Sequence, residues 1–246
     1  MLTPVERNSL SEQVFRQLQR EILNEQYRAG DRLPSERELC DVLGVNRSSV
    51  REALKRLEQA RLIEIRHGSG SVVLDFRFNA GFELVGTLVA AGGQLGPIAF
   101  RSIFEFRSLI GPEIARLAAQ RIQQPELDRL EHLVDKIESC SRDDGEELQA
   151  LDFEFHHTMA MASENLALVL ILNSVRDVYF ELREAFTAIF AENVGSQWHY
   201  RPIVDALAAH DEKRSTELCC ELIELGNAAF WSSNTNGSSG SGRKEH

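Results

Sequence analysis

Hydrophobic residues at helical spacing predict a first helix over residues 10–26, because Val14 and Leu18 fall on one face of such a helix. The next segment, "YRAGDRLP", contains a glycine and a proline and ends that helix. In "PSERELCDVLG", Ser35 and Glu38 have the spacing of a capping box, and the closing glycine is a natural helix stop. A second, short helix is therefore predicted between them.

After a tight turn through "GVN", the segment "RSSVREALKRLEQA" predicts a helix with two distinct faces. Val50, Leu54 and Leu57 form its inner apolar stripe. Its outer face carries a cation at every fourth position and a serine near its start, namely Arg47, Ser48, Arg51 and Lys55. The next segment, "RLIEIRHGSGSVVL", predicts two strands joined by a glycine-rich tip. The small residues beside His67 would let the backbone approach a binding partner closely.

These features occur in the order of a winged helix-turn-helix: a short helix, a tight turn, a helix with a basic outer face, and a hairpin. The competing interpretation is that the charged face is merely solvated, as a single charged face usually is. Because all four features stand in the right order and spacing, the sequence favours DNA binding.

From about residue 79 the pattern becomes almost wholly helical, which predicts an all-α bundle. The helices are expected at 80–92, 97–121, 125–141, 145–162, 165–190, 197–210 and 213–231. The helix at 165–190 is apolar nearly all round, so we expect it to be central and buried. The predicted fold class is thus mainly α, with an N-terminal winged helix-turn-helix, a small β-hairpin wing and a C-terminal all-α helical bundle.

The length of 246 residues exceeds the usual size of one domain. We expect a DNA-binding domain at 1–75, followed by a linker with a first helix at 76–95. A helical effector-binding and dimerisation domain is expected at 96–231, and a disordered Ser/Gly-rich tail at 232–246. The longest apolar run, "LALVLIL", is too short to span a membrane, and the N-terminus lacks the apolar core of a signal peptide. Four cysteines without metal-type spacing fit a reducing cytoplasm.

The net charge of −11 is unevenly distributed along the chain. Residues 1–75 hold 12 basic and 12 acidic residues, so the rest of the chain carries the entire excess of negative charge. An acidic protein can still bind nucleic acid through a small, locally basic surface, because phosphate attraction is screened over short distances. Charge alone therefore leaves DNA binding open.

The segment "LPSERELCDVLGVNRSSVREALKRLEQARLIEIRHGSGSVV" closely resembles the winged helix-turn-helix of the GntR family of bacterial transcription regulators. The resemblance implies major-groove and phosphate contacts from Arg37, Arg47 and Arg51. It further implies phosphate contacts from Ser35, Ser48 and Ser49, and minor-groove contacts at the wing tip from His67 and Gly68. Arginine at a helix start can reach guanine through two hydrogen bonds, and serine hydroxyls suit phosphates.

The second half resembles the ligand-sensing domain of the FadR branch of this family. The matching pieces are "EFRSLIGPEIARLAAQRI", "LDFEFHHTMAMASENLALVLIL" and "HYRPIVDALAAHD". The resemblance implies a small effector in the bundle centre and a homodimer. The linker "VVLDFRFNAGFELVGTLVA" is similar to that of branch members that regulate fatty-acid metabolism.

Many members of this branch hold a divalent metal with one Asp and three His, and the resemblance places the first two ligands at Asp152 and His156. The third falls on Tyr200, with His199 one residue earlier, and the fourth falls near Leu222. Two protein ligands rarely hold zinc tightly, although a hard cation with several waters needs fewer. We therefore expect no tightly bound metal, while an incomplete site of Asp152, His156 and His199 remains open.

The sequence offers little for catalysis. "EFHH" differs from the metalloprotease motif His-Glu-x-x-His in order and spacing, no Gly-rich phosphate loop appears, and Ser163 and Cys140 lack a matched base. We therefore expect that the protein is not an enzyme. The alternative function is a metal-dependent small-molecule hydrolase whose site is built on the helical bundle. A helical module that only dimerises the DNA-binding domain is another.

Polar residues expected to line an effector pocket are Arg107, Asp152, His156, Asn173, Arg176 and Tyr200. A buried Arg107 guanidinium needs an anionic partner, which is either an effector carboxylate or phosphate, or an internal partner such as Glu113 or Asp152. The predicted function is a cytoplasmic, homodimeric regulator, in this family usually a repressor, on a pseudo-palindromic double-stranded operator. Its effector is expected to be a small organic acid or a long-chain acyl-CoA.

Overall fold

The computed structural model of the chain describes residues 10–66, 68, 70–91, 94–141, 144–181 and 199–237. They form two units, Met1–Phe100 and Arg101–His246, each with its own hydrophobic core. The sequence placed the first boundary at residue 75, but Leu84 and Leu88 pack into the core of the first unit. The segment after the wing thus belongs to the first unit.

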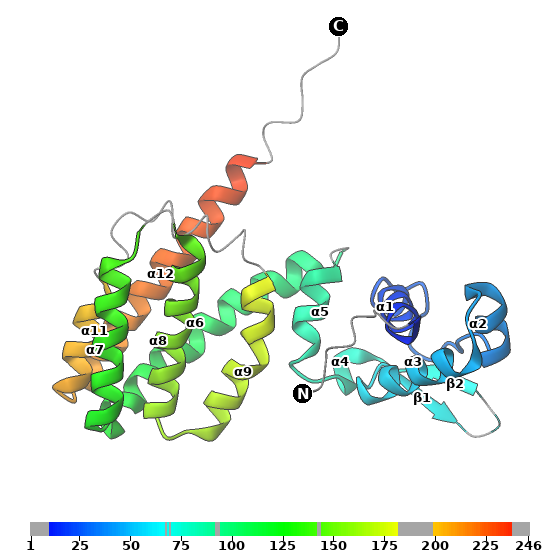
Figure 1. The fold of residues 1–246 in the computed structure, drawn as a ribbon, viewed down its shortest axis with the longest axis horizontal. Coiled ribbons are helices and arrows are strands. Elements are labelled where there is room, and N and C mark those ends of the chain that lie inside the picture. Colours follow the sequence, from blue (N-terminus) through cyan, green and yellow to red (C-terminus); the bar gives the residue numbers. More distant parts are fainter. Residues whose placement is uncertain are drawn as a thin grey trace, which may run out of the picture. The chain divides into compact units, whose positions relative to one another are not determined.

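The first unit is a winged helix-turn-helix, as the sequence predicted (Figure 1). Its elements in chain order are α1 (Leu10–Leu23), α2 (Glu36–Leu43), α3 (Arg47–Gln59), β1 (Ile63–Arg66), β2 (Gly70–Val73), α4 (Phe76–Asn79) and α5 (Leu84–Ala91). Helix α3 packs against α1, α2 and β1. It does so through the predicted inner stripe, since Val50 and Leu57 are fully buried.

The wing is a two-stranded antiparallel sheet in which Ile63 pairs with Val73 and Arg66 with Gly70. Arg32, in the segment before α2, forms a further bridge to Val72. Backbone hydrogen bonds from Leu33 N–H to Ser71 O and from Val73 N–H to the carbonyl before Arg32, each 2.9 Å, join that segment to the wing. The wing is therefore fixed to the body of the unit along its β2 edge.

The second unit is a helical bundle, which confirms the predicted class (Figure 1). Its elements are α6 (Gly96–Arg121, which begins in the first unit), α7 (Gln124–Ser139), α8 (Gly145–Ala162), α9 (Leu166–Glu181), α11 (Tyr200–Ala208) and α12 (Glu212–Gly237). Helix α8 packs between α7 and α9, and α11 packs on α7 and α12. Their shared core is centred on the fully buried Phe155, Met159 and Ile203.

Two expectations for this unit need correction. Helix α9 is not buried all round, since Leu166 is 69% and Leu170 is 54% exposed. Val169 and Val178, which lie half a turn apart around the helix, are buried, so the described residues cover α9 only in part. Helix α12 continues to Gly237, so the start of the expected tail is helical, and 238–246 lie outside the described residues.

Residues 182–198 also lie outside the described part of the chain, and they include the end of the helix expected at 165–190. Within the described residues, no helix combines the length and the apolar character needed to cross a membrane.

Candidate functional site

Local hydrogen bonds fix the helix-turn-helix. The hydroxyl of Ser35 accepts the N–H of Glu38 at 3.3 Å, and the Glu38 carboxylate accepts the N–H of Ser35 at 2.8 Å, which forms the predicted capping box. These bonds lower the pKa of Glu38. Gly44 ends α2 with φ 64°, and Asn46, which the sequence pattern did not indicate, begins α3 by accepting the N–H of Ser49 at 2.9 Å. The two helices are thus held at a tight turn by their own caps.

The exposed cations of this surface differ in what they contact. Arg37, Arg47 and Lys55 make no hydrogen bond or ion pair with any residue that the structure describes. Arg51 instead donates from Nε to both carboxylate oxygens of Glu36, at 3.0 and 2.8 Å. The first three side chains can therefore reach a phosphate or a base edge directly, whereas Arg51 would have to leave or share a carboxylate.

The serines predicted to contact phosphates also differ in whether their hydroxyls are already engaged within the protein. The Ser35 hydroxyl is engaged in the cap of α2. Ser48 is exposed and Ser49 is partly exposed in the first turn of α3. At the wing tip, Gly68 has φ 75° and Gly70 has φ 81°, in the left-handed region that favours glycine. His67 lies outside the described residues, so its expected contact with DNA stays a prediction.

The second unit contains a pocket. Its walls come from α6, α8, α9 and α12 and are mainly apolar, with Ile103, Phe104, Phe106, Ile110, Ile114, Phe153, Leu172, Val175, Val178 and Ile223. Four polar side chains, Arg107, Asp152, His156 and Tyr179, also line it. Such a hollow, apolar with a few convergent polar groups, is typical of a small-molecule site.

Asp152 is the centre of this polar group. Its side chain is buried, and both of its oxygens accept a phenol hydrogen bond, from Tyr179 at 2.5 Å and from Tyr200 at 2.7 Å. Burial would raise the pKa of Asp152, but His156, Arg107 and Tyr179 outweigh that effect and hold the pKa well below its ordinary value. Burial, reinforced by the Asp152 charge, raises the pKa of both tyrosines. The carboxylate is therefore ionised and the phenols are neutral donors.

Arg107 and His156 lie on the pocket side of this carboxylate. The Nη2 atom of Arg107 is 3.9 Å from Asp152 Oδ2 and 3.4 Å from His156 Nε2. The Nε2 atom of His156 is also 3.4 Å from Asp152 Oδ1. Despite the burial of Arg107, the nearby Asp152 charge raises its pKa. Of the two internal partners expected for Arg107, the structure selects Asp152, because Glu113 is paired with Arg116.

The residues around Asp152 do not fit a metal ion. The two carboxylate oxygens already accept phenol hydrogens, and the Arg107 guanidinium stands close by, where it would repel a cation. Leu222, which the resemblance aligned with a ligand, is a buried core residue. His199 lies at the start of α11, and the described residues contain no group of three or more His, Cys, Asp or Glu that could hold a metal.

The structure does not bring Asn173 and Arg176 to this pocket. Both are exposed on α9. Asn173 Oδ1 lies 3.1 Å from His157 Nε2, and the Arg176 guanidinium lies 5.7 Å from the centre of the Phe153 ring. Tyr179 of the same helix, which the sequence pattern did not single out, takes their place in the polar group. Arg107, Asp152, His156 and Tyr200 do come together, as the sequence expected.

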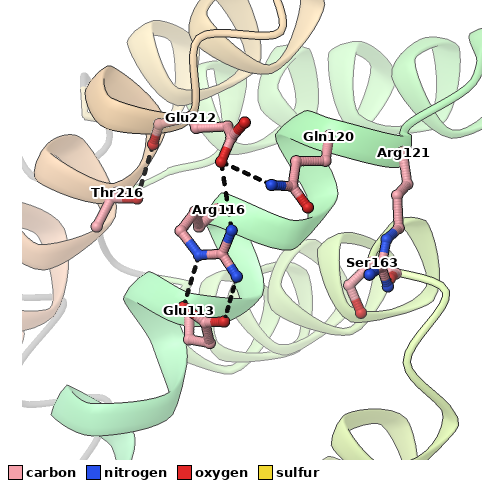
Figure 2. Close-up of polar contacts among 7 residues, drawn as sticks. All are labelled: Glu113, Arg116, Gln120, Arg121, Ser163, Glu212 and Thr216. Carbon is pink, nitrogen blue, oxygen red and sulfur yellow. Dashed lines mark hydrogen bonds and ion pairs between the residues drawn. The ribbon is translucent and has the colours of Figure 1, made fainter.

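Polar contacts beyond the pocket hold α6 in place (Figure 2). Arg116 donates to Glu113 on its own helix at 2.8 and 2.5 Å and to Glu212 of α12 at 3.3 Å. Gln120 also donates to Glu212, at 2.7 Å. Arg121 donates at 2.6 Å to the carbonyl of Ser163, the residue that caps the end of α8. The C-terminal half of α6 is thus tied both to α12 and to α8, which fixes the walls of the pocket.

Comparison with known proteins agrees with both units. Residues 10–73 match the family described as "Bacterial regulatory proteins, gntR family", and residues 102–225 match the FCD domain. The HTH-type transcriptional regulator Mce2R of Mycobacterium tuberculosis is 35% identical over 93% of this chain and 95% of its own length. A fatty acid metabolism regulator protein of Shewanella pealeana is 29% identical over 65% of each chain.

Among solved structures, Lar of Listeria monocytogenes superposes with a TM-score of 0.58 at 18% identity, covering 92% of this chain and 99% of that one, which supports the fold. The matched domains and relatives are those of transcription regulators and not of enzymes, which overturns the hydrolase alternative. The chain belongs to the GntR family of bacterial DNA-binding transcription regulators, with an FCD domain of the FadR type as its second unit.

Proposed function

We propose that this regulator is a cytoplasmic repressor that binds a pseudo-palindromic operator as a homodimer and releases it when a small effector fills the pocket of the FCD domain. The observation that carries the proposal is the pocket itself, with its apolar walls and its polar group at Asp152. Since operator half-sites are spaced by the helical repeat of DNA, a small reorientation of two winged domains is enough to cost affinity.

Two effector classes agree with the sequence, a small organic acid and a long-chain acyl-CoA. The apolar walls suit the hydrocarbon part of either. The similarity to a fatty acid metabolism regulator protein supports a ligand with an acyl chain. A module that only dimerises would need neither the pocket nor a guanidinium in its wall.

The DNA-binding half of the proposal is tested with Arg47→Ala. Arg47 is exposed at the start of α3 and makes no hydrogen bond or ion pair within the described chain, so its loss should leave the fold intact. We expect duplexes selected from a random pool by the wild-type protein to lose binding by about 10-fold or more, because one two-bond arginine–guanine contact contributes about 1–3 kcal/mol. Fluorescence anisotropy measures the loss.

Arg28→Ala is the matched control, since it removes the same charge from an exposed position outside α2 and α3. It should keep nearly full affinity. An Arg47→Ala variant that melts like the wild type and binds the selected duplex equally well would refute the assigned surface.

The sensing half is tested by a thermal-shift screen of organic acids and acyl-CoA thioesters on the full-length protein, followed by anisotropy with the hits. A ligand that binds only the folded state raises the melting temperature. At least one hit should also release the selected duplex. If every stabilising ligand left DNA affinity unchanged, the proposed regulation would be wrong.

A further inference from the structure

Arg107 presents hydrogen-bond donors to the pocket that none of the described residues uses. A guanidinium has five N–H donors. Within the described residues, Arg107 makes one hydrogen-bond contact, between Nη2 and His156 Nε2 at 3.4 Å. Its side chain retains 25% exposure, and it lines the pocket among apolar neighbours. The guanidinium is therefore partly desolvated, and most of its N–H donors have no acceptor among the described residues.

Asp152 does not consume those donors. Its two oxygens are already bonded by the phenols of Tyr179 and Tyr200, and the nearest Arg107 nitrogen stands 3.9 Å away, beyond hydrogen-bond range. Asp152 compensates the charge of Arg107 through space, which permits a guanidinium to be buried without a ligand. The two phenols thus keep the carboxylate satisfied and leave the planar N–H fork of Arg107 for another anion.

The charges of the lining limit that anion. Arg107 is the one Lys or Arg side chain among the residues that line the described pocket, and Asp152 is the one carboxylate. The first negative charge of a ligand can bond Arg107 directly, whereas a second one would face the Asp152 carboxylate with no further Lys or Arg in the described lining. A monoanion fits this balance better than a phosphate ester or a dicarboxylate.

The shape of the wall indicates what the rest of the ligand is. The pocket residues on either side of Arg107 on α6, Phe106 and Ile110, are apolar, as are Leu172 and Val175 of α9. A hydrocarbon body would lose its water there. The neutral thioester of an acyl-CoA would bring no charge to Arg107, and the described lining offers no further Lys or Arg for its phosphates.

From these contacts we infer that the pocket binds the free carboxylate of an apolar monocarboxylic acid, held by the guanidinium fork of Arg107 without a metal ion. Arg107 is the cation of the site, and Tyr179 and Tyr200 occupy the positions at Asp152 that a metal would need. This inference rests on the proposed function, because it names the ligand class of the same pocket.

The test uses the full-length protein dialysed against EDTA and isothermal titration calorimetry with octanoate, octanamide and octanoyl-CoA, with butyrate and dodecanoate to vary the chain. Octanoate should bind more tightly than octanamide and octanoyl-CoA. Its Kd should be the same after EDTA and after addition of Zn²⁺. Carboxylates that bind only with Zn²⁺, or octanoyl-CoA that binds more tightly than every carboxylate, would overturn the inference.

Two variants locate the carboxylate. Arg107→Met should weaken octanoate binding by about 10- to 100-fold, the effect of losing charge-assisted hydrogen bonds, and leave octanamide binding unchanged. Arg107→Lys keeps the compensating charge beside Asp152 and loses the planar fork, so it should fold and bind octanoate with intermediate affinity. Arg176→Met is the matched control, because Arg176 is exposed on α9 outside the pocket, and it should bind like the wild type.

Equal octanoate affinity in Arg107→Lys and in the wild type would refute the role of the fork. Failure of the inference is distinguishable from failure of the proposed function by assaying the same preparations on the selected duplex. If no carboxylate binds but another screened ligand releases DNA, the inference is wrong and the proposed regulation stands. If octanoate binds through Arg107 and DNA affinity does not change, the ligand class is right and the proposed regulation is wrong.

Discussion

At the scale of single residues, Cys219 and Cys220 show how burial separates two adjacent side chains of one type. Cys219 is fully buried in the core of the second unit, and burial raises the pKa of its thiol to about 12. Cys220 is only partly buried, and its pKa is also raised, by burial and by Glu224 and Glu221. Since the thiolate is the reactive form, the two thiols should differ in reactivity as well as in access.

We expect iodoacetamide at pH 8 to modify Cys220 in the folded protein and to leave Cys219 untouched. Raising the pH from 7 to 9 should speed the reaction of Cys220, because more of it ionises, while Cys219 stays protonated below its raised pKa of about 12. Fragmentation of the peptide that holds both residues measures each rate. In urea the two rates should become similar, and equal rates in the folded protein would contradict the buried position of Cys219.

The polar group at Asp152 could be predicted from sequence only where a local rule applied. Asp152 and His156 are four residues apart on one helix, so their proximity follows from helical geometry. The hydrogen bond from Tyr179 to Asp152 joins two helices. Because tyrosine also packs in apolar helix faces, hydrophobic periodicity could not reveal this bond. Asn173 and Arg176 were expected in the pocket on chemical type alone, and the rotation of α9 places them outside it.

At the scale of elements, the crossing of α6 and α12 depends on Gly111. A Cβ added at Gly111 would overlap the Cδ1 atom of Ile223 and would lie 3.7 Å from Cys219 Sγ. Ile223 is 1% exposed and also lines the pocket, so it has little room to move. Gly111 therefore lets two pocket helices approach closely, although glycine in a helix is less favourable than alanine by about 1 kcal/mol.

Gly111→Ala should lower the melting temperature. Overpacking a core costs about 1–3 kcal/mol, whereas replacing glycine by alanine in a helix gains at most about 1 kcal/mol. In an Ile223→Val background the overlapping Cδ1 is absent, so the same change should lower the melting temperature less. Thermal denaturation of the four proteins gives the coupling between the two sites. An equal effect of Gly111→Ala in both backgrounds would show that the crossing is not tight.

The helices and strands were largely predictable from sequence, but the burial of their faces and the length of the last helix were not. The capping box at Ser35 and the stop at Gly44 are local signals, so α2 was found from its own residues. The helical period also found α6 as one helix despite Pro112 within it. Which face of α9 is covered, and how far α12 extends, depend on contacts with distant residues or on weak propensities, and the chain pattern misjudged both.

At the scale of the whole molecule, a net charge of −11 must coexist with binding to DNA. The first 75 residues are electrically neutral, so attraction to phosphates has to come from individual cations on one surface. Arg37, Arg47 and Lys55 make no hydrogen bond or ion pair within the described chain, whereas Arg51 is paired with Glu36. Binding should therefore depend on few phosphate contacts and respond strongly to the loss of one of them.

Lys55→Ala tests this dependence and the proposed homodimer together. Each phosphate contact contributes about 0.9 to the slope of log K against log salt concentration, so losing one contact in each of two subunits on a duplex should lower the slope by about 1.8. Lys136→Ala removes an exposed cation from the second unit and should leave the slope unchanged. Anisotropy titrations from 50 to about 300 mM salt measure the slopes. A decrease near 0.9 would indicate that a single subunit contacts the duplex, and no decrease would exclude Lys55 from the phosphate contacts.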